Sequence, residues 1–243
     1  MRLDVVLAAD AAVPGQLDGT TVLVVDVLRA STTMIAALGN GCAAITPVGD
    51  AMEARRLARA HGANGALVAG ERHGEPIAGF DCGNSPLEFT QDRVGGKTVF
   101  FTTSNGTRAL LAAREAHAIG VAALVNLTAA ADWAVGEGRD VVVLCAGERG
   151  APSLEDHVCA WLLVERMTTA APAAASSPAA QAAAVEGRRY AEDVTRLRQD
   201  SPWARRLEAA GRGADIAACL RVDTTTLVPV YLPSVDKVVA GRG

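Results

Sequence analysis

Short apolar runs alternate along the chain with longer segments of helical pattern. The apolar runs predict buried β-strands at 3–8, 20–27, 43–48, 65–70, 97–103, 118–125, 140–147 and 228–233. Segments of helical length lie between most of them, at 31–39, 50–61, 105–117, 127–136 and 153–167. Because strands that alternate with helices form a parallel sheet covered on both faces, the pattern predicts an α/β fold with a mainly parallel sheet and helices on both faces.

The last third of the chain departs from this alternation. Residues 168–184, TTAAPAAASSPAAQAAA, form an Ala/Ser/Pro-rich tract in which two prolines interrupt the helix that the alanines favour, so we expect a surface linker. Beyond it, 185–200 predicts a charged amphipathic helix. A second helix is predicted at 201–211, with Ser201 as N-cap, a proline as first helical residue and Gly211 as stop.

Composition narrows the class of protein. A chain of 243 residues that is 50% apolar can bury the core of one large domain or of two tight subdomains. The apolar runs are shorter than a membrane helix and no leader is seen, so we expect a cytoplasmic protein without a membrane partner. A net charge of −4 without a basic cluster argues against nucleic acid. Five cysteines without a CxxC pair argue against disulfides and structural zinc.

Polar residues gather directly after five of the predicted strands. Ligands of α/β sheets bind at the carboxyl ends of strands, so these residues mark a candidate active site. In chain order they are Asp26, Arg29, Ser31, Thr32, Thr33, Glu71, Arg72, His73, Asp81, Asn84, Ser85, Thr102, Thr103, Ser104, Asn105, Gly106, Thr107, Asn126, Glu148, Arg149, Ser153, Glu155 and Asp156.

Two of these clusters open helices and are rich in Gly, Ser, Thr and Asn. Such helix starts offer N–H groups and hydroxyls to an oxyanion, although the same hydroxyls serve equally well as helix caps. Arginines beside them favour phosphate, sulfonate or carboxylate, unless they are solvated surface charges. The candidate substrate-binding residues are Arg29, Ser31, Thr32, Arg72, Asn84, Ser85, Thr103, Ser104, Asn105, Gly106 and Thr107.

Carboxylates beside anion-binding loops suit Mg²⁺, which proteins hold with one or two carboxylates, water and substrate phosphate. Structural ion pairs with the nearby arginines are the alternative interpretation. The candidate metal ligands are Asp26, Glu71, Asp81, Glu155 and Asp156, and the candidate catalytic residues are Asp26, Arg29, Glu71 and Asp81.

Four motifs, VVDVLRASTT, GER followed by GFDCGNSPLEFT, GGKTVFFTTSNGTRAL and CAGERGAPSLEDHVCA, resemble the 2-phosphosulfolactate phosphatase, or ComB, family. The likeness runs from about 20 to 166 and resumes at 211–230, while the tract 168–184 and the segment 203–208 depart from the family pattern. The resemblance implies a Mg²⁺-dependent phosphatase of ComB-like α/β fold with two closely packed subdomains. It also implies conversion of (2R)-phospho-3-sulfolactate to 3-sulfolactate and phosphate, in coenzyme M biosynthesis.

The residues favour in-line attack of water on phosphorus, with Mg²⁺ and arginine neutralising the phosphoryl oxygens, and leave a covalent phosphoenzyme open. A haloacid-dehalogenase-type phosphatase would need a second aspartate two residues after Asp26, where the chain has Leu28. Two rivals stay open. One is an isochorismatase-like thiol hydrolase using Asp26, Lys97 and Cys145; the other is a non-catalytic anion-binding module. A homodimer is also left open.

Overall fold

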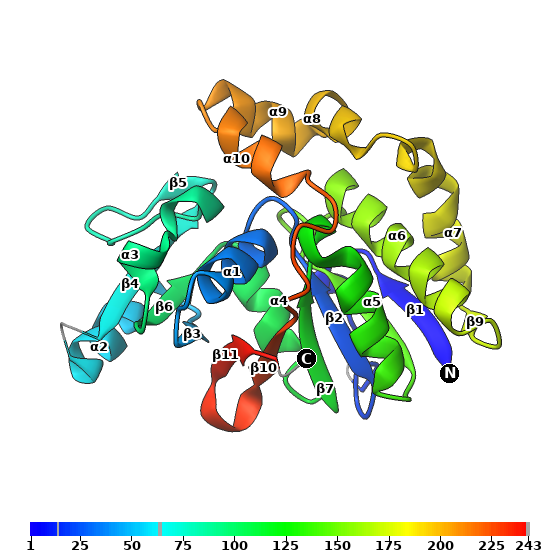
Figure 1. Ribbon diagram of the computed structural model, residues 1–243, viewed down its shortest axis with the longest axis horizontal. Coiled ribbons are helices and arrows are strands. Elements are labelled where there is room, and N and C mark those ends of the chain that lie inside the picture. Colours follow the sequence, from blue (N-terminus) through cyan, green and yellow to red (C-terminus); the bar gives the residue numbers. More distant parts are fainter. Residues whose placement is uncertain (14, 63–64, 242–243) are drawn as a thin grey trace.

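The computed structural model describes residues 1–13, 15–62 and 65–241 (Figure 1). Within these residues, eleven strands form one sheet in the order β5-β4-β6-β3-β11-β10-β7-β2-β8-β1-β9. They are β1 (Arg2–Val6), β2 (Thr21–Val25), β3 (Ala44–Pro47), β4 (Ala66–Arg72), β5 (Glu75–Pro76), β6 (Thr98–Thr102), β7 (Ala118–Ala122), β8 (Val141–Cys145), β9 (Ala175–Ser176), β10 (Pro229–Leu232) and β11 (Lys237–Ala240).

The helices lie mostly between strands, as the alternation predicts. They are α1 (Ala30–Gly39), α2 (Ala51–His61), α3 (Gln91–Val94), α4 (Gly106–Ala112), α5 (Leu127–Gly136), α6 (Leu154–Ala170), α7 (Pro178–Gly187), α8 (Leu197–Asp200), α9 (Pro202–Ala209) and α10 (Gly213–Cys219). Single 3₁₀ turns lie at Ala9–Ala11, Pro86–Glu88, Leu124–Asn126, Arg188–Tyr190, Val194–Arg196 and Pro233–Val235. All eight predicted strands and all five predicted interstrand helices are present, so the α/β prediction is confirmed.

Helices cover both faces of the sheet. Along β2, Leu23 and Val25 face the core formed with α5, α6 and the C-terminal helices, whereas Val22 and Val24 face the core beneath α1 and α4. Side chains that alternate between two apolar layers explain why the strand is apolar throughout. Helices α7 to α10 continue past the sheet along one edge of the molecule (yellow to orange, Figure 1).

The sheet consists of two parallel blocks joined by an antiparallel hairpin. One block is β4-β6-β3 and the other is β7-β2-β8-β1-β9. Between them, β11 pairs antiparallel with β3, β10 with β11, and β10 with β7. Three successive antiparallel pairings mean that the two blocks run in opposite directions.

The tract 168–184, predicted as a surface linker, is instead mostly regular structure. It contains the end of α6, strand β9 beside β1, and the first half of α7. Ser177 accepts a hydrogen bond from Ala180 N (3.1 Å) and so caps α7, whose first residue is proline. Ala180 and Ala183 are fully buried. The prediction was wrong because the second proline starts a helix, where its missing N–H costs nothing.

The predicted helix at 185–200 is broken, because α7 ends at Gly187 and Asp193 caps a new turn through Thr195 N (2.9 Å). The helix at 201–211 is confirmed. Ser201 accepts from Ala204 N (3.0 Å), and Gly211 has φ +77°, which suits the residue after a helix end. Among the residues that the structure describes, no helix has both the length and the hydropathy needed to cross a bilayer.

Candidate active site

A cavity of about 550 Å³, including its open mouth, lies where the carboxyl ends of β2, β4, β6 and β8 come together. These strands belong to two blocks of opposite direction, and the twist of so wide a sheet turns their ends toward each other. Twelve of the candidate site residues line this cavity. Eight of them carry a predicted catalytic, substrate-binding or metal-binding role, namely Asp26, Arg29, Glu71, Asn84, Ser104, Asn105, Glu155 and Asp156, and the other four are His73, Glu148, Arg149 and Ser153.

Asp26 is delivered to the cavity by the end of β2. Its backbone N–H donates to Ser31 Oγ (2.9 Å), and its Oδ1 accepts from Ala30 N (3.1 Å), so the carboxylate is fixed against the first turn of α1. Burial raises the pKa of Asp26 to about 8, and the charge of Asp156 adds to the rise. A carboxyl group with this pKa is mostly protonated at neutral pH in the absence of a bound cation.

The hydroxyls that follow Asp26 do not face the cavity. Ser31 Oγ donates to Val24 O (3.3 Å) and Thr32 Oγ1 to Val27 O (3.0 Å), and both side chains are buried. Neither residue lines the cavity, and their binding of substrate stays a prediction. Hydroxyls in the first turn of a helix readily bond to nearby backbone groups, and here they bind the carbonyls of the preceding strand and loop.

Arg29 lines the cavity, but its charge is already matched. Its Nη1 lies 2.5 Å from Asp215 Oδ2 and its Nη2 donates to Gly74 O (2.9 Å), in a site where Arg29 is only 3% exposed. Ser85 Oγ donates to the other oxygen of Asp215 (2.5 Å). The hydroxyl of Ser85 thus completes this buried ion pair, and Ser85 does not line the cavity, so its direct binding of substrate stays a prediction.

Glu71 joins two loops at the cavity wall. Its Oε2 accepts from Gly74 N (2.6 Å) and its Oε1 from Ser104 N (2.7 Å). His73 N in turn donates to Ser104 Oγ (3.0 Å). Glu71 therefore holds the β4-β5 hairpin against the turn that precedes α4, with both of its oxygens engaged.

The turn at 103–107 presents two of its predicted residues to the cavity, Ser104 and Asn105. Thr103 and Thr107 instead bond to each other, each backbone N–H donating to the hydroxyl of the other residue (3.1 and 3.0 Å). Neither residue lines the cavity, and their binding of substrate stays a prediction. Gly106 is needed for close approach. A Cβ there would lie 2.5 Å from Ala30 Cβ and 2.7 Å from Asp26 Oδ2.

Glu155 and Asp156 come from the start of α6. Asp156 Oδ1 accepts from Val27 N (2.8 Å) and its Oδ2 from Gly147 N (3.2 Å), whereas Glu155 Oε2 accepts from Ser201 Oγ (2.7 Å). Burial raises the pKa of each carboxyl to about 7, and the charge of Glu155 further raises that of Asp156.

Arg72 and Asp81 also lie outside the cavity. Arg72 donates to Glu71 O (2.8 Å) and Thr102 Oγ1 (2.9 Å), which ties β4 to β6. Asp81 is exposed and accepts from Val68 N (2.8 Å), in the middle of β4 and away from its carboxyl end. Asp81 therefore does not line this cavity, because the returning chain places it beside the strand and not beyond its carboxyl end.

The sequence interpretation missed Asp215 and Trp203, which come from the C-terminal helices. Trp203 lines the cavity and its Nε1 donates to Leu28 O (2.8 Å). Asp215 stands in the otherwise apolar helix GADIAAC, a pattern that could have indicated a buried, paired charge. Asn84 is also notable, since its buried Oδ1 has no hydrogen-bond donor among the described residues although the side chain lines the cavity.

The carboxylate oxygens that line the cavity suit a divalent cation held by only a few protein ligands. Within the described residues no three His, Cys, Asp or Glu side chains form a ready metal-binding group. Glu71 and Asp156 use both oxygens on backbone N–H groups. Asp26 Oδ2 and Glu155 Oε1 have no donor in the described part of the chain. Two free carboxylate oxygens are what Mg²⁺ commonly takes from a protein.

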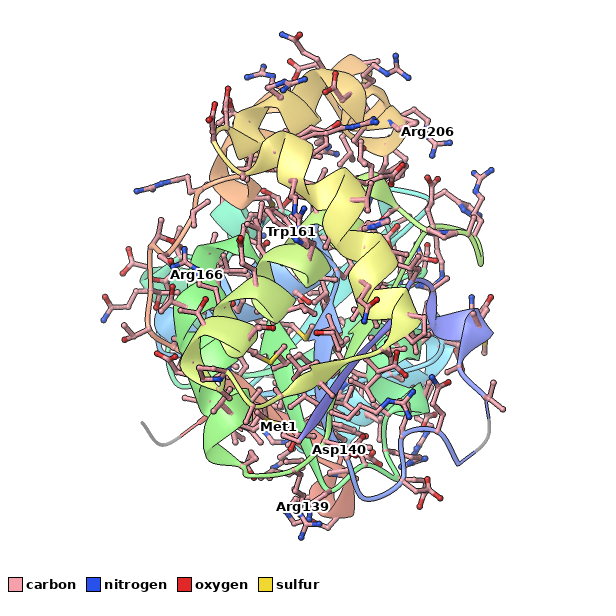
Figure 2. The ribbon with its side chains drawn as sticks, turned by 90° about the vertical axis from the view of Figure 1, so that its right-hand side faces the viewer. Met1, Arg139, Asp140, Trp161, Arg166 and Arg206 are labelled. Atoms are coloured by element: carbon pink, nitrogen blue, oxygen red, sulfur yellow. The ribbon has the colours of Figure 1, made fainter. Side chains whose placement is uncertain are left out.

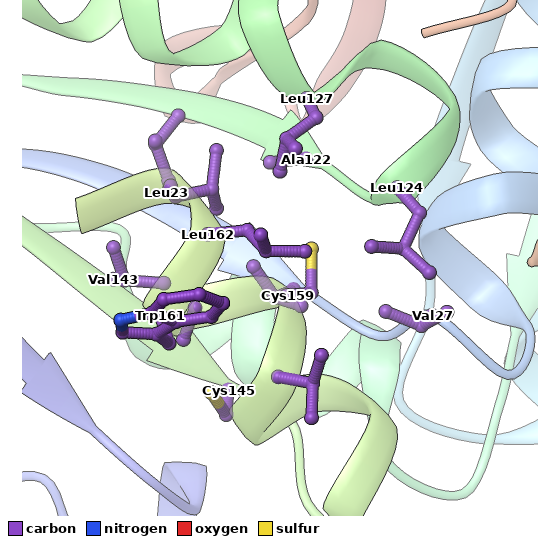
Figure 3. Packing of buried hydrophobic residues seen from close by; sticks show 14 of the residues in the cluster. Leu23, Val27, Ala122, Leu124, Leu127, Val143, Cys145, Cys159, Trp161 and Leu162 are labelled. Carbon is purple, nitrogen blue, oxygen red and sulfur yellow. The ribbon is translucent and has the colours of Figure 1, made fainter. Parts of the chain in front are cut away.

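The thiol-hydrolase rival does not fit the structure. Cys145 is fully buried among apolar side chains of the core (Figure 3), and burial raises its pKa well above the ordinary value, which opposes thiolate formation. Lys97 precedes β6, at the end of the strand away from the cavity, and donates to Arg93 O (2.9 Å). Asp26, Lys97 and Cys145 therefore do not form a catalytic triad.

An acidic cavity at the carboxyl ends of strands in a mainly parallel sheet is the arrangement of an α/β enzyme. The family model described as 2-phosphosulpholactate phosphatase matches residues 7–233. A probable 2-phosphosulfolactate phosphatase of Symbiobacterium thermophilum is 36% identical over 216 residues, covering 89% of this chain and 93% of its own. That of Clostridium acetobutylicum is 32% identical over 231 residues, covering 95% and 97%.

A third relative with the same description, from Synechococcus sp., is 36% identical over 235 residues, covering 94% of this chain and 96% of its own. The chain belongs to the 2-phosphosulfolactate phosphatase family and, with it, to the phosphoric monoester hydrolases. The motif resemblance seen in the sequence is thereby confirmed.

Proposed function

We propose that this chain hydrolyses the phosphate ester of a small organic acid, with 2-phosphosulfolactate as the candidate substrate. The observation that supports this most directly is the contact between the Asp26 loop and the 104–106 turn at Gly106, which places a buried carboxylate beside a helix start in one cavity. The products would be 3-sulfolactate and phosphate, which would place the enzyme in coenzyme M biosynthesis in the cytoplasm.

A divalent cation is part of this proposal because of the charge in the cavity. Five carboxylates line it, of which Glu148 is paired with Arg206, and the guanidinium of Arg29 is balanced by Asp215. The remaining carboxylates would repel a dianionic phosphate. We assign Asp26 and Glu155 as the holders of Mg²⁺. Bound Mg²⁺ supplies neutralisation of the phosphoryl oxygens during displacement.

The chain's own residues would position the reactants. The side-chain amides of Asn84 and Asn105 line the cavity and offer neutral donors to phosphoryl oxygens. Asp156 is held by Val27 N and Gly147 N, and its pKa of about 7 suits a group that accepts the proton of an attacking water. The water oxygen bonds to phosphorus as the ester P–O bond breaks, and the leaving oxygen takes up the proton that Asp156 removed from the water, so the alcohol leaves neutral and Asp156 is again ionised.

Chelation of the purified enzyme tests the proposal. We expect EDTA to abolish release of phosphate from phosphomonoesters and added Mg²⁺ to restore it. The variant Glu155→Gln should need roughly 10-fold or more Mg²⁺ for half-maximal rate, since loss of a ligand weakens metal binding strongly. Asp81→Asn is the matched control, because Asp81 lies outside the cavity, and it should keep the wild-type Mg²⁺ requirement. Turnover indifferent to EDTA would rule out the metal.

A further inference from the structure

The loop after β8 is a tight two-residue turn at the mouth of the cavity. Glu148 N donates to Ala151 O (2.7 Å) and Ala151 N donates to Glu148 O (3.0 Å). The two residues between them both have left-handed backbone, Arg149 with φ +51° and Gly150 with φ +78°. Positive φ at both central positions is the geometry of a type I′ turn.

Arg149 is an unfavourable choice for its place in this turn. The first central position of a type I′ turn favours Asn, Asp or Gly, because these residues adopt left-handed backbone at little cost. Gly150 fits its position, but an arginine gains nothing from this backbone. The turn itself therefore does not explain the residue, and strained backbone of this kind is typical of functional sites.

Within the part of the chain that the structure describes, the charge of Arg149 is also without a partner. Arg29 pairs with Asp215, and Arg206 of α9 pairs with Glu148 at the cavity mouth. Arg149 lines the cavity and is exposed, and no carboxylate of the described residues lies within ion-pair distance of it. A rigid turn thus holds a free guanidinium over an acidic cavity.

We propose that Arg149 is a specificity-determining residue that binds a second acidic group of the substrate, a carboxylate or sulfonate, while the phosphate lies deeper beside Asp26 and Glu155. This rests on the proposed function. A guanidinium binds a carboxylate or a sulfonate through two parallel N–H donors. A substrate whose only charged group is its phosphate would need no such donors at the mouth of the cavity. The enzyme would therefore select phosphate esters of acids over phosphate esters of simple alcohols.

The variant Arg149→Asn gives a sharp test, because Asn suits a type I′ turn and should keep the fold, which thermal unfolding checks. Two matched substrates are compared, 2-phosphoglycolate and ethyl phosphate, which share a two-carbon ester and differ in the carboxylate. We expect the kcat/KM ratio of 2-phosphoglycolate to ethyl phosphate to fall by about 10- to 100-fold, mainly through KM. Arg149→Lys should restore part of this ratio.

Arg139→Asn is the control, since Arg139 is an exposed arginine at the opposite end of the molecule (Figure 2), and it should leave the ratio unchanged. A ratio in Arg149→Asn equal to that of wild type overturns the inference. If the wild type hydrolyses neither ester, the proposed function fails. Calorimetric binding of sulfoacetate to the wild type and to Arg149→Asn then tests the role of Arg149 separately. Binding at least about 10-fold weaker in Arg149→Asn then supports the inference, and equal or absent binding overturns it.

Discussion

At the scale of single residues, the cavity depends on charges that are matched before any ligand arrives. Arg29 comes from the loop after β2, Asp215 from α10 and Ser85 from the turn before Pro86, and they form one buried hydrogen-bonded group. Burial of an unpaired charge is costly, so each member keeps the others in place. The guanidinium of Arg29 thus stabilises the cavity wall, whereas we propose that the guanidinium of Arg149 binds a ligand.

Asp215→Ala should lower the free energy of unfolding by about 3–5 kcal/mol, because it leaves the guanidinium of Arg29 buried without a counter-charge. Ser85→Ala removes one hydrogen bond to the same carboxylate and should cost only about 1 kcal/mol. The double variant Arg29→Met/Asp215→Leu should lose less stability than Asp215→Ala. Urea denaturation of the three variants measures these differences. If Asp215→Ala lowers the free energy of unfolding by less than about 1 kcal/mol, the buried guanidinium of Arg29 does not need Asp215 as its counter-charge.

The kinds of residue at the site could be predicted, but their individual roles only in part. Asp26, Glu71, Glu155 and Asp156 follow strands and reach the cavity, as strand position predicts. Hydroxyls such as that of Thr32 also follow strands, yet they bind carbonyls nearby, and no sequence pattern separates the two outcomes. The partner of Arg29 lies 186 residues away, beyond any local signal.

At the scale of elements, the site is made by helix starts packed closely against one another. The first turn of α1 and the turn that opens α4 touch at Gly106, where even a methyl group would overlap Ala30. Glycine is required here for space, since its φ is not in the left-handed region. The contact joins one parallel block to the other at the point where Asp26 enters the cavity.

Gly106→Ala should therefore be destabilising by about 1–3 kcal/mol through overpacking and should reduce turnover by displacing Asp26. Gly136→Ala is the matched control, because it also lies in a helix but nothing stands within 4 Å of its added Cβ. There alanine should be neutral or stabilising by up to about 1 kcal/mol. Denaturation midpoints and steady-state rates of both variants give the comparison. Wild-type stability in Gly106→Ala would contradict the close approach.

At the scale of the whole molecule, the hairpin β10-β11 sets how the two parallel blocks meet. Strand alternation predicts each block, because most strands in it are followed by a helix of suitable length. The reversal of direction between the blocks could not be predicted from the sequence. It depends on the four-residue strand β11 (Lys237–Ala240), which pairs with β3 of the first block at a single position. Carboxylates from both blocks nonetheless line one cavity.

This gathering of buried carboxylates should make stability depend on pH. The pKa values of Asp26, Glu155 and Asp156 are raised from about 4 to about 8, 7 and 7 by burial first. Between pH 5 and 8.5 the folded protein therefore holds protons that the unfolded chain has lost, and stability falls as pH rises through this range. Each kcal/mol lost should lower Tm by about 2–4 °C in a chain of this size.

With EDTA present, Tm should accordingly be several degrees lower at pH 8.5 than at pH 5.5, and Asp26→Asn should reduce this difference by removing the group with the highest of the three pKa values. Added Mg²⁺ should raise Tm mainly at pH 8.5, because protons compete for the same carboxylates at pH 5.5. Thermal unfolding followed by circular dichroism, with EDTA or Mg²⁺ at both pH values, measures each effect. A metal-free protein that is equally stable or more stable at pH 8.5 would show that these carboxylates are not held protonated by the fold.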